Sequence, residues 1–246
     1  MRFLLSNDDG IDAPGLKILA DTFGRIGQVA VVAPDANRSG ASHSITPHRT
    51  LRASDFGNGW FALDGTPADC VQVALRQLLP EPPDLVISGI NEGANLADEV
   101  NYSGTVGAAR EAVLLGVPAL AVSLAGKAPW HFETAARMAV LVASQWRERS
   151  LPFETCLNIN VPNGPIFAVK PPIVTRLGRR MVAMPPPRGR DGQPPPYWKA
   201  VEQPTGGRFM DDYQAVAAGH VSVTPLRFDA TFDAIMEELA LWPTFR

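Results

Sequence analysis

Short apolar runs alternate with helix-forming patterns along most of this chain, and this alternation limits the fold more than any other feature. Near the N-terminus, Leu16, Leu19, Ala20 and Phe23 share one face of a helix that begins near Pro14. Most strand-length runs are apolar throughout, which is typical of parallel strands covered on both faces. We therefore expect an α/β fold with a mostly parallel sheet and helices on both faces. The expected strands are 3–6, 29–33, 60–63 (half of a hairpin), 84–88, 119–123 and 157–161. The other expected helices are 66–79, 105–115 and 132–146.

The C-terminal third differs in composition. Eleven of the 23 prolines lie between Pro162 and Pro204, so this segment cannot be a helix or a central strand. An extended arm, a loop over a site and an element exchanged between subunits all remain open. This segment also carries a cluster of positive charge, made by Arg176, Arg179, Arg180, Arg188 and Arg190. We interpret the cluster as a solvated arm or a contact with another subunit; the alternative is contact with long anionic substrates. A last helix is expected over 229–241.

Composition and charge exclude several classes of protein. A net charge of −3 does not provide the positive face that general nucleic-acid binding requires. Cys70 and Cys156 are far apart and lack a CxxC spacing, which argues against a disulfide scaffold or a structural zinc site and favours the cytoplasm. The longest apolar stretch, 112–126, is shorter than the ~20 residues of a membrane span. We expect a cytoplasmic protein with no membrane segment.

Two adjacent acids, Asp8 and Asp9, directly follow the first predicted strand. Ligands of open α/β sheets bind beyond the carboxyl ends of the strands, and two acids held together need a cation between them. Ser39 and Asn91, in the segments after two further strands, complete an all-oxygen set suited to Mg²⁺, Mn²⁺ or Ca²⁺. The alternative for the acidic pair by itself is a plain turn, because Asn-Asp-Asp-Gly is also good turn chemistry.

An anion site is expected close to these ligands. Ser103, Gly104 and Thr105 open the helix over 105–115, and free N–H groups at a helix start attract phosphate. Without a neighbouring metal, the same residues would be an ordinary helix cap. His43 has two interpretations, a proton donor to a leaving group or an exposed loop residue without a role, and we favour the second.

Several motifs occur in a fixed order along the chain: 6–10 (SNDDG), 32–35 (VAPD), 37–42 (NRSGAS), 65–71 (GTPADCV), 88–91 (SGIN) and 102–106 (YSGTV), with weaker similarity at 157–162, 174–176 and 219–226. Together they resemble the SurE (stationary-phase survival protein E) family of metal-dependent nucleoside monophosphate phosphatases. The likeness spans nearly the whole chain, and a set of motifs with matching spacing is far more specific than any one of them. One departure is the run 209–213, where the family often has Gly-Thr-Asp.

The resemblance implies a fold, a cofactor and a set of partners. It implies a Rossmann-like core over about residues 1–165 within a single domain, 1–246. Residues 166–246 would then form an oligomerisation arm or hairpin and the terminal helix, exchanged in a homodimer or homotetramer. The implied cofactor is one divalent cation per subunit, Mg²⁺ or Mn²⁺. The implied substrates are nucleoside 5′-monophosphates, together with 3′-monophosphates and short polyphosphate.

For such an enzyme we assign roles to the candidate residues. Asp8 and Asp9 are the catalytic pair and, with Ser39 and Asn91, the metal ligands. The phosphoryl oxygens are assigned to Asn95, Ser103, Gly104 and Thr105. A metal-activated water is preferred over a covalent aspartyl-phosphate on Asp8, because enzymes of the latter kind usually show Asp-x-Asp. The alternative to an enzyme is a non-hydrolytic nucleotide-binding or assembly protein with a vestigial metal site.

Overall fold

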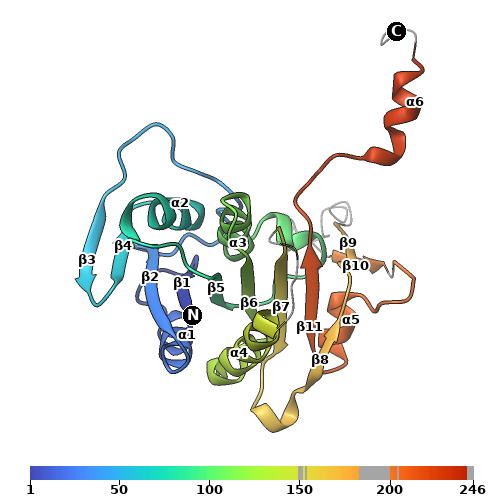
Figure 1. Cartoon of the computed structure of the whole chain (residues 1–246). Coiled ribbons are helices and arrows are strands. Elements are labelled where there is room, and N and C mark those ends of the chain that lie inside the picture. Colours follow the sequence, from blue (N-terminus) through green and yellow to red (C-terminus); the bar gives the residue numbers. More distant parts are fainter. Residues whose placement is uncertain (149–151, 153, 183–199, 204, 243–246) are drawn as a thin grey trace, which may run out of the picture.

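In the part of the chain that the structure describes, nine strands form one sheet in the order β3-β4-β2-β1-β5-β6-β7-β11-β8 (Figure 1). The structure is a computed structural model, and it describes residues 1–148, 152, 154–182, 200–203 and 205–242. β9 (Arg179–Val182) and β10 (Ala200–Gln203) pair separately as an antiparallel ladder. The strands of the large sheet are β1 (Arg2–Ser6), β2 (Gln28–Pro34), β3 (Ala53–Gly57), β4 (Trp60–Leu63), β5 (Leu85–Glu92), β6 (Ala119–Ala125), β7 (Cys156–Pro162), β8 (Lys170–Val174) and β11 (His220–Leu226).

The predicted mostly parallel α/β sheet is confirmed. Six consecutive strands are parallel to one another, in the order β4, β2, β1, β5, β6 and β7, while β3 joins β4 as an antiparallel hairpin at one edge. At the other edge β11 is antiparallel to β7 and parallel to β8. The hairpin expected around 60–63 is therefore present, with its turn at Asn58 and Gly59, both of which have positive φ.

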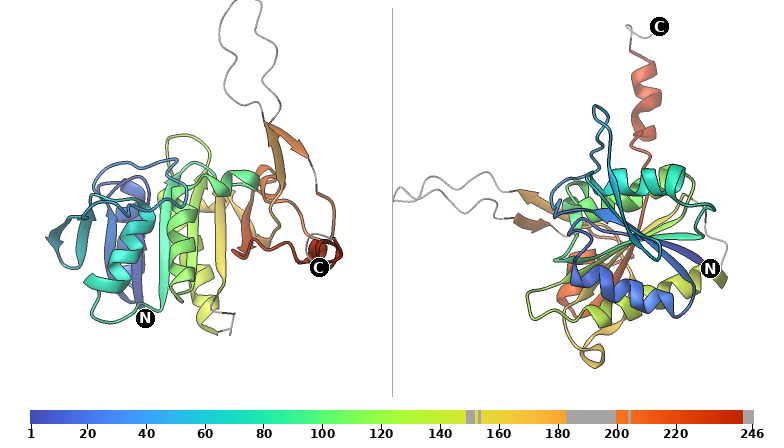
Figure 2. Two further views of the ribbon diagram at one scale, coloured as in Figure 1. Left: turned by 90° about the horizontal axis from the view of Figure 1, so that it is seen from above. Right: turned by 90° about the vertical axis from the view of Figure 1, so that its left-hand side faces the viewer.

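Helices cover both faces of the sheet (Figure 2, right). α1 (Pro14–Gly24) and α4 (Phe132–Glu148) lie on one face, and α2 (Pro67–Val73) and α3 (Gly104–Leu114) on the other. β1 shows why the middle of a central strand is apolar on both faces: Phe3 and Leu5 join the core under α1 and α4, whereas Leu4 joins the core under α2 and α3. The remaining helical segments are η1 (Ala74–Leu78, a π-turn that continues α2), η2 (Ala97–Asn101), η3 (Ile166–Ala168), α5 (Asp212–Ala217), η4 (Asp233–Ile235) and α6 (Met236–Ala240).

The C-terminal third differs from expectation in two ways. β11 is not predicted from the sequence because Ser222 and Thr224 lie buried within it, where a central strand usually carries apolar residues. Both hydroxyls lie 2.7 Å from the Thr175 hydroxyl, which satisfies them inside the sheet. The terminal helix is shorter than predicted: 229–232 is not helical, and the helical part begins at Asp233.

The proline-rich segment follows the rule that proline is restricted to sheet edges. β8, which carries Pro171 and Pro172, is the last strand of the sheet. β9, β10 and α6 extend away from the body of the molecule (Figures 1 and 2). The predictions for Arg188 and Arg190 lie outside the described residues. Among the described helices, none combines the length and apolar character needed to cross a bilayer.

The strand order creates a switch point at β1. From β1 the chain moves outward to β2 and β4, and then returns to place β5 on the other side of β1. The connections that leave β1 and β5 therefore diverge at their carboxyl ends, the place where open α/β sheets bind ligands. Three of the four predicted metal ligands lie in the segments that follow β1 and β2, and the fourth, Asn91, lies near the carboxyl end of β5.

Candidate active site

The first strand ends in a tight turn that carries both predicted carboxylates. Asn7 holds this turn, because its side-chain Nδ2 donates to the Gly10 carbonyl over 2.9 Å and its Oδ1 accepts from the Gly10 N–H over 3.2 Å. Gly10 has a φ of +103°, a conformation that other residues rarely adopt. The turn chemistry of this motif is thus present, and it places Asp8 and Asp9 together at the carboxyl end of β1.

Asp8 is held by the first turn of α3. The residue is 3% exposed, and Thr105 Oγ1 donates to its Oδ1 over 2.6 Å. Gly104 lies directly against the same carboxylate: a Cβ at this position would lie 2.8 Å from Asp8 Cβ and 2.9 Å from Asp8 Oδ2. Burial raises the pKa of Asp8, and the hydrogen bond from Thr105 partly opposes that rise. Glycine is needed here so that the helix can approach the acid.

The negative charge of Asp9 is less well compensated than that of Asp8. The pKa of Asp9 is raised to about 6. Burial is the largest cause and the negative charge of Asp8 the second; a backbone hydrogen bond from Glu92 partly opposes the rise, and the charge of Glu92 adds slightly to it. Asp9 Oδ2 is buried, and it has no hydrogen-bond partner within the described part of the chain. Two adjacent acids with a buried unsatisfied oxygen are the arrangement that a bound cation would stabilise.

Ser39 and Asn91 approach this pair from β2 and β5. The Arg38 N–H donates to the Asp8 carbonyl over 2.7 Å, which fixes the segment after β2 against the end of β1. β5 runs to Glu92, so Asn91 lies on the strand and not in a loop after residue 88 as predicted. The strand is irregular there, because its register against β6 shifts between residues 89 and 91. Asn91 Nδ2 donates to the Gly93 carbonyl over 2.9 Å, which leaves its amide oxygen for another partner.

One pocket of about 380 Å³ unites most of the predicted residues. Its walls include Asp8, Ser39, Asn91, Asn95 and Ser103. The donor set consists of carboxylate, hydroxyl and amide oxygens, which suits a hard divalent cation. In the described residues no three His, Cys, Asp or Glu side chains form a metal-binding group. The buried orphan oxygen of Asp9 and this donor chemistry both fit such a cation.

The predicted phosphate-binding residues surround the start of α3. Ser103 is its N-cap: the hydroxyl oxygen accepts from the Val106 N–H over 3.1 Å, so the hydroxyl proton can still be donated to a ligand. Thr105 differs from expectation, since its hydroxyl donates to Asp8 and only its backbone N–H faces the open helix end. Its assignment to phosphate stays a prediction that rests on that N–H.

Comparison with known proteins identifies the family. The family model described as "Survival protein SurE" matches residues 3–184. The chain belongs to the SurE family. It is 46% identical to the "5′-nucleotidase SurE" of Geotalea daltonii over 255 residues, covering 100% of both chains. It is 47% identical to the "5′-nucleotidase SurE" of Legionella pneumophila over 248 residues, covering 98% of this chain and 96% of that protein. The crystal structure of the SurE protein from Aquifex aeolicus is similar, with a TM-score of 0.87, 38% identity and 98% of each chain covered.

The interior of this SurE fold contains a polar support for Asn95 that the sequence analysis did not identify. The Asn95 N–H donates to Asn160 Oδ1 over 2.8 Å, and its carbonyl accepts from Asn158 and Asn160 over 2.8 and 3.0 Å. Its side-chain Nδ2 donates to Ser123 Oγ over 2.8 Å. The signal was present in the sequence: two asparagines interrupt the otherwise apolar β7. Buried polar residues on a central strand indicate a partner in the interior.

His43 is also not the exposed loop residue that we favoured. Its Nε2 lies 2.8 Å from Glu111 Oε2 on α3, and its side chain is 22% exposed. Gln72 on α2 donates to the other Glu111 oxygen over 3.1 Å. Gly107 has no room for a side chain, because a Cβ there would lie 2.3 Å from the Ser42 carbonyl oxygen. The SurE segment that carries Ser39 is thus packed tightly against α3, and His43 is part of that contact.

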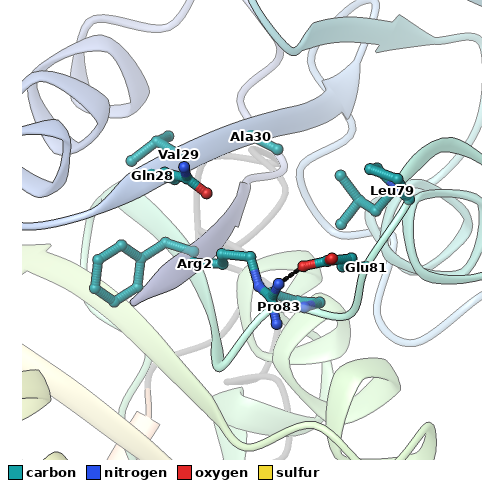
Figure 3. A pocket seen from close by; sticks show the side chains of 9 residues that line it. Arg2, Gln28, Val29, Ala30, Leu79, Glu81 and Pro83 are labelled. Atoms are coloured by element: carbon teal, nitrogen blue, oxygen red, sulfur yellow. Dashed lines mark ion pairs between the residues drawn. The ribbon is translucent and has the colours of Figure 1, made fainter.

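A second pocket lies at the opposite end of β1 and contains none of the predicted site residues (Figure 3). It has a volume of about 280 Å³ and lies between the start of β1, β2 and the segment after η1. Arg2 in its wall forms an ion pair with Glu81, and the Arg2 N–H donates to Asp84 over 2.7 Å. Its charged groups are therefore already paired, in contrast to the acids at the carboxyl end of the sheet.

Proposed function

We propose that this chain is a 5′-nucleotidase, a hydrolase that converts nucleoside 5′-monophosphates to nucleosides and phosphate. One observation carries the proposal: the buried Asp8 lines a pocket at the N-terminus of α3, and the adjacent Asp9 has a buried oxygen without a hydrogen-bond partner among the described residues. The curated relatives of similar length are named 5′-nucleotidases, which supports the same activity. Activity on 3′-monophosphates and short polyphosphate belongs to the same proposal. A vestigial site is disfavoured because all the predicted ligand residues are present.

The cofactor we propose is one divalent cation, Mg²⁺ or Mn²⁺, held by Asp8, Asp9, Ser39 and Asn91. The orphan Asp9 oxygen and the hard oxygen donors support this assignment. When bound, such a cation neutralises phosphoryl oxygens and lowers the pKa of a coordinated water.

Residues of the chain bind the phosphate and accept the proton of the attacking water. The free N–H groups and positive dipole of α3, with the Ser103 hydroxyl, bind the phosphoryl oxygens. Asn95 is fixed by β6 and β7 in the wall of the same pocket and is assigned to the same anion. Asp8 orients the attacking water and accepts its proton while the water oxygen bonds to phosphorus and the P–O bond to the nucleoside breaks, and the released nucleoside oxygen takes up a proton from solvent. Thr105 holds the Asp8 carboxylate in one orientation, which favours this role over nucleophilic attack by Asp8.

Phosphate release from a panel of nucleoside monophosphates tests the activity. We expect release from the 5′-monophosphates of adenosine, guanosine, cytidine and uridine with Mn²⁺ or Mg²⁺, and none after treatment with a chelator. Restoring the cation to the chelated protein should restore activity, which separates cation loss from unfolding. Binding of the nucleotides without any phosphate release would contradict the proposal and favour the non-hydrolytic alternative.

Metal binding should weaken in acid, because a carboxylate must lose its proton before it can ligate a cation. The pKa of Asp9, raised to about 6, lies within the range where this competition is measurable. Above this pKa Asp9 is ionised and binding is insensitive to its titration; below it, protons compete. We expect calorimetric Mn²⁺ affinity to be at least about ten-fold lower near pH 5 than near pH 7.5. Equal affinities at both pH values would contradict the assignment of Asp9 as a ligand.

We further propose a homodimer or homotetramer built by exchange of C-terminal segments, and a cytoplasmic location. α6 extends away from the body (Figure 1), and the segment that carries it exposes Phe232, Met236 and Leu241. Such apolar side chains on an extended arm favour burial against a second copy. Both cysteines are free and buried, which suits a reducing compartment. A monomeric mass by light scattering would contradict the assembly, and recovery from cells outside the cytosolic fraction would contradict the location.

A further inference from the structure

Tyr102 presents an aromatic ring at the edge of the active-site pocket. The residue is 70% exposed and lines the same pocket as Asp8 and Ser103. It is the one aromatic residue among the described residues of that wall, which otherwise carries small, amide, hydroxyl and acidic side chains. The ring is therefore accessible to a ligand bound in the pocket.

The backbone of Tyr102 is fixed independently of its side chain. Its N–H donates to the Glu99 carbonyl over 2.9 Å, and its carbonyl accepts from the Ser42 N–H over 3.2 Å. Ser42 Oγ also donates to the Asn101 carbonyl over 2.6 Å. The ring is therefore carried on a segment tied both to η2 and to the segment after β2. A substitution of the ring should leave this segment in place.

The position of the ring relative to the helix start matches the shape of a nucleotide. A nucleoside 5′-monophosphate carries its phosphate and its base on the two sides of one ribose. Tyr102 directly precedes Ser103, the N-cap of the helix whose N-terminus is assigned to phosphate. Neighbouring Cα atoms are about 3.8 Å apart, so the side chain that carries the ring starts directly beside the proposed phosphate site. An aromatic ring stacks on any base, because every base has a π-face.

We propose that Tyr102 stacks on the base of the substrate and thereby makes this site favour nucleotides over phosphate monoesters that lack a base. This inference rests on the proposed nucleotidase activity and adds the part of the substrate that the site recognises. Glu92 and Glu99 in the same wall are acidic, so an uncharged nucleoside suits this side of the pocket better than additional phosphate groups. Tyr102 is accordingly a specificity-determining residue, and it takes no part in breaking the phosphate ester bond.

The test compares adenosine 5′-monophosphate with ribose 5-phosphate, which has the same phosphate ester without the base. For wild type and each variant, the ratio of kcat/KM for the nucleotide to kcat/KM for the sugar phosphate is measured. We expect Tyr102→Ala and Tyr102→Leu to lower this ratio by about ten-fold, mainly through KM for the nucleotide. Tyr102→Phe should keep the ratio within about two-fold, because it retains the stacking surface.

A matched control variant shows whether loss of any exposed aromatic ring changes the ratio. Phe56 on β3 is 63% exposed and does not line the pocket, so Phe56→Ala should leave the ratio unchanged. An unchanged ratio in Tyr102→Ala would overturn the inference, and so would an equal fall in kcat/KM for both substrates, which would mean that the ring only supports the fold. Failure of the proposed function looks different: wild type would release phosphate from neither substrate, and both proposals would fall.

Discussion

Replacing Asp9 with asparagine is expected to abolish hydrolysis and, at the same time, to make the metal-free protein more stable. The loss in kcat/KM should be at least about a thousand-fold, because the substitution removes a carboxylate that holds the cation. Calorimetric Mn²⁺ binding should be lost as well. Asp12→Asn is the matched control: Asp12 is an exposed acid close to the same turn, bound to Lys17 over 3.1 Å. That variant should keep wild-type activity and Mn²⁺ affinity.

The stability gain follows from the direction of the pKa shift. The folded protein raises the pKa of Asp9 from 3.8 to about 6, so it holds the proton more tightly than the unfolded chain does. Above both values the charged acid disfavours folding, and this cost disappears as pH falls through 6 toward 4. Because Asp9 is partly exposed, solvent screening limits the effect, and we expect Asp9→Asn to stabilise the metal-free protein by about 1 kcal/mol near pH 7.5.

Thermal unfolding at two pH values checks this sign. Near pH 7.5, without metal, the Tm of Asp9→Asn should exceed that of wild type by about 2–4 °C. Near pH 5 the difference should shrink, because Asp9 is then largely protonated in the folded wild-type protein. A lower Tm for the variant, or hydrolysis close to the wild-type rate, would show that Asp9 is not an uncompensated acid at a metal site.

Gly104→Ala is expected to cause the second large loss, through the position of Asp8. Alanine ordinarily favours a helix over glycine. At this position, however, the added Cβ would lie 2.8 Å from Asp8 Cβ and 2.9 Å from Oδ2, so the acid must move. Misplacing a catalytic group by about 1 Å can cost about a hundred-fold, which is the loss in kcat/KM that we expect here. Mn²⁺ affinity should fall together with activity.

Gly24→Ala provides the control for this substitution. Gly24 ends α1, and an added Cβ there meets no atom within 4 Å. We expect that variant to keep wild-type activity, with a Tm equal to or slightly above that of wild type. Gly104→Ala should still unfold cooperatively, since the clash is confined to one side chain. If Gly104→Ala retained full activity, then Asp8 would not require the position that α3 imposes on it.

Much of the fold could be predicted because its signals are local. β1, β2, β6 and β7 are mostly apolar runs of strand length, and α3 begins where Ser103 supplies a cap. The errors have a common physical cause. β11 is hidden by buried hydroxyls that satisfy one another across the sheet, and the His43–Glu111 contact joins residues 68 positions apart. Interactions of this kind depend on partners that no local pattern reveals.

By itself, the sequence determined the chemical character of the site: acids after the first strand, a serine and an asparagine after two others, and a capped helix start beside them. Only the tertiary structure decided that these groups meet, because the order β2-β1-β5 makes neighbours of three strand ends that are far apart along the chain. It also decided the roles within the site, by giving the Thr105 hydroxyl to Asp8 and leaving Asp9 Oδ2 without a partner among the described residues. The reason is that side-chain type is encoded residue by residue, whereas distance and desolvation arise only when the strands have paired and the helices have packed against them.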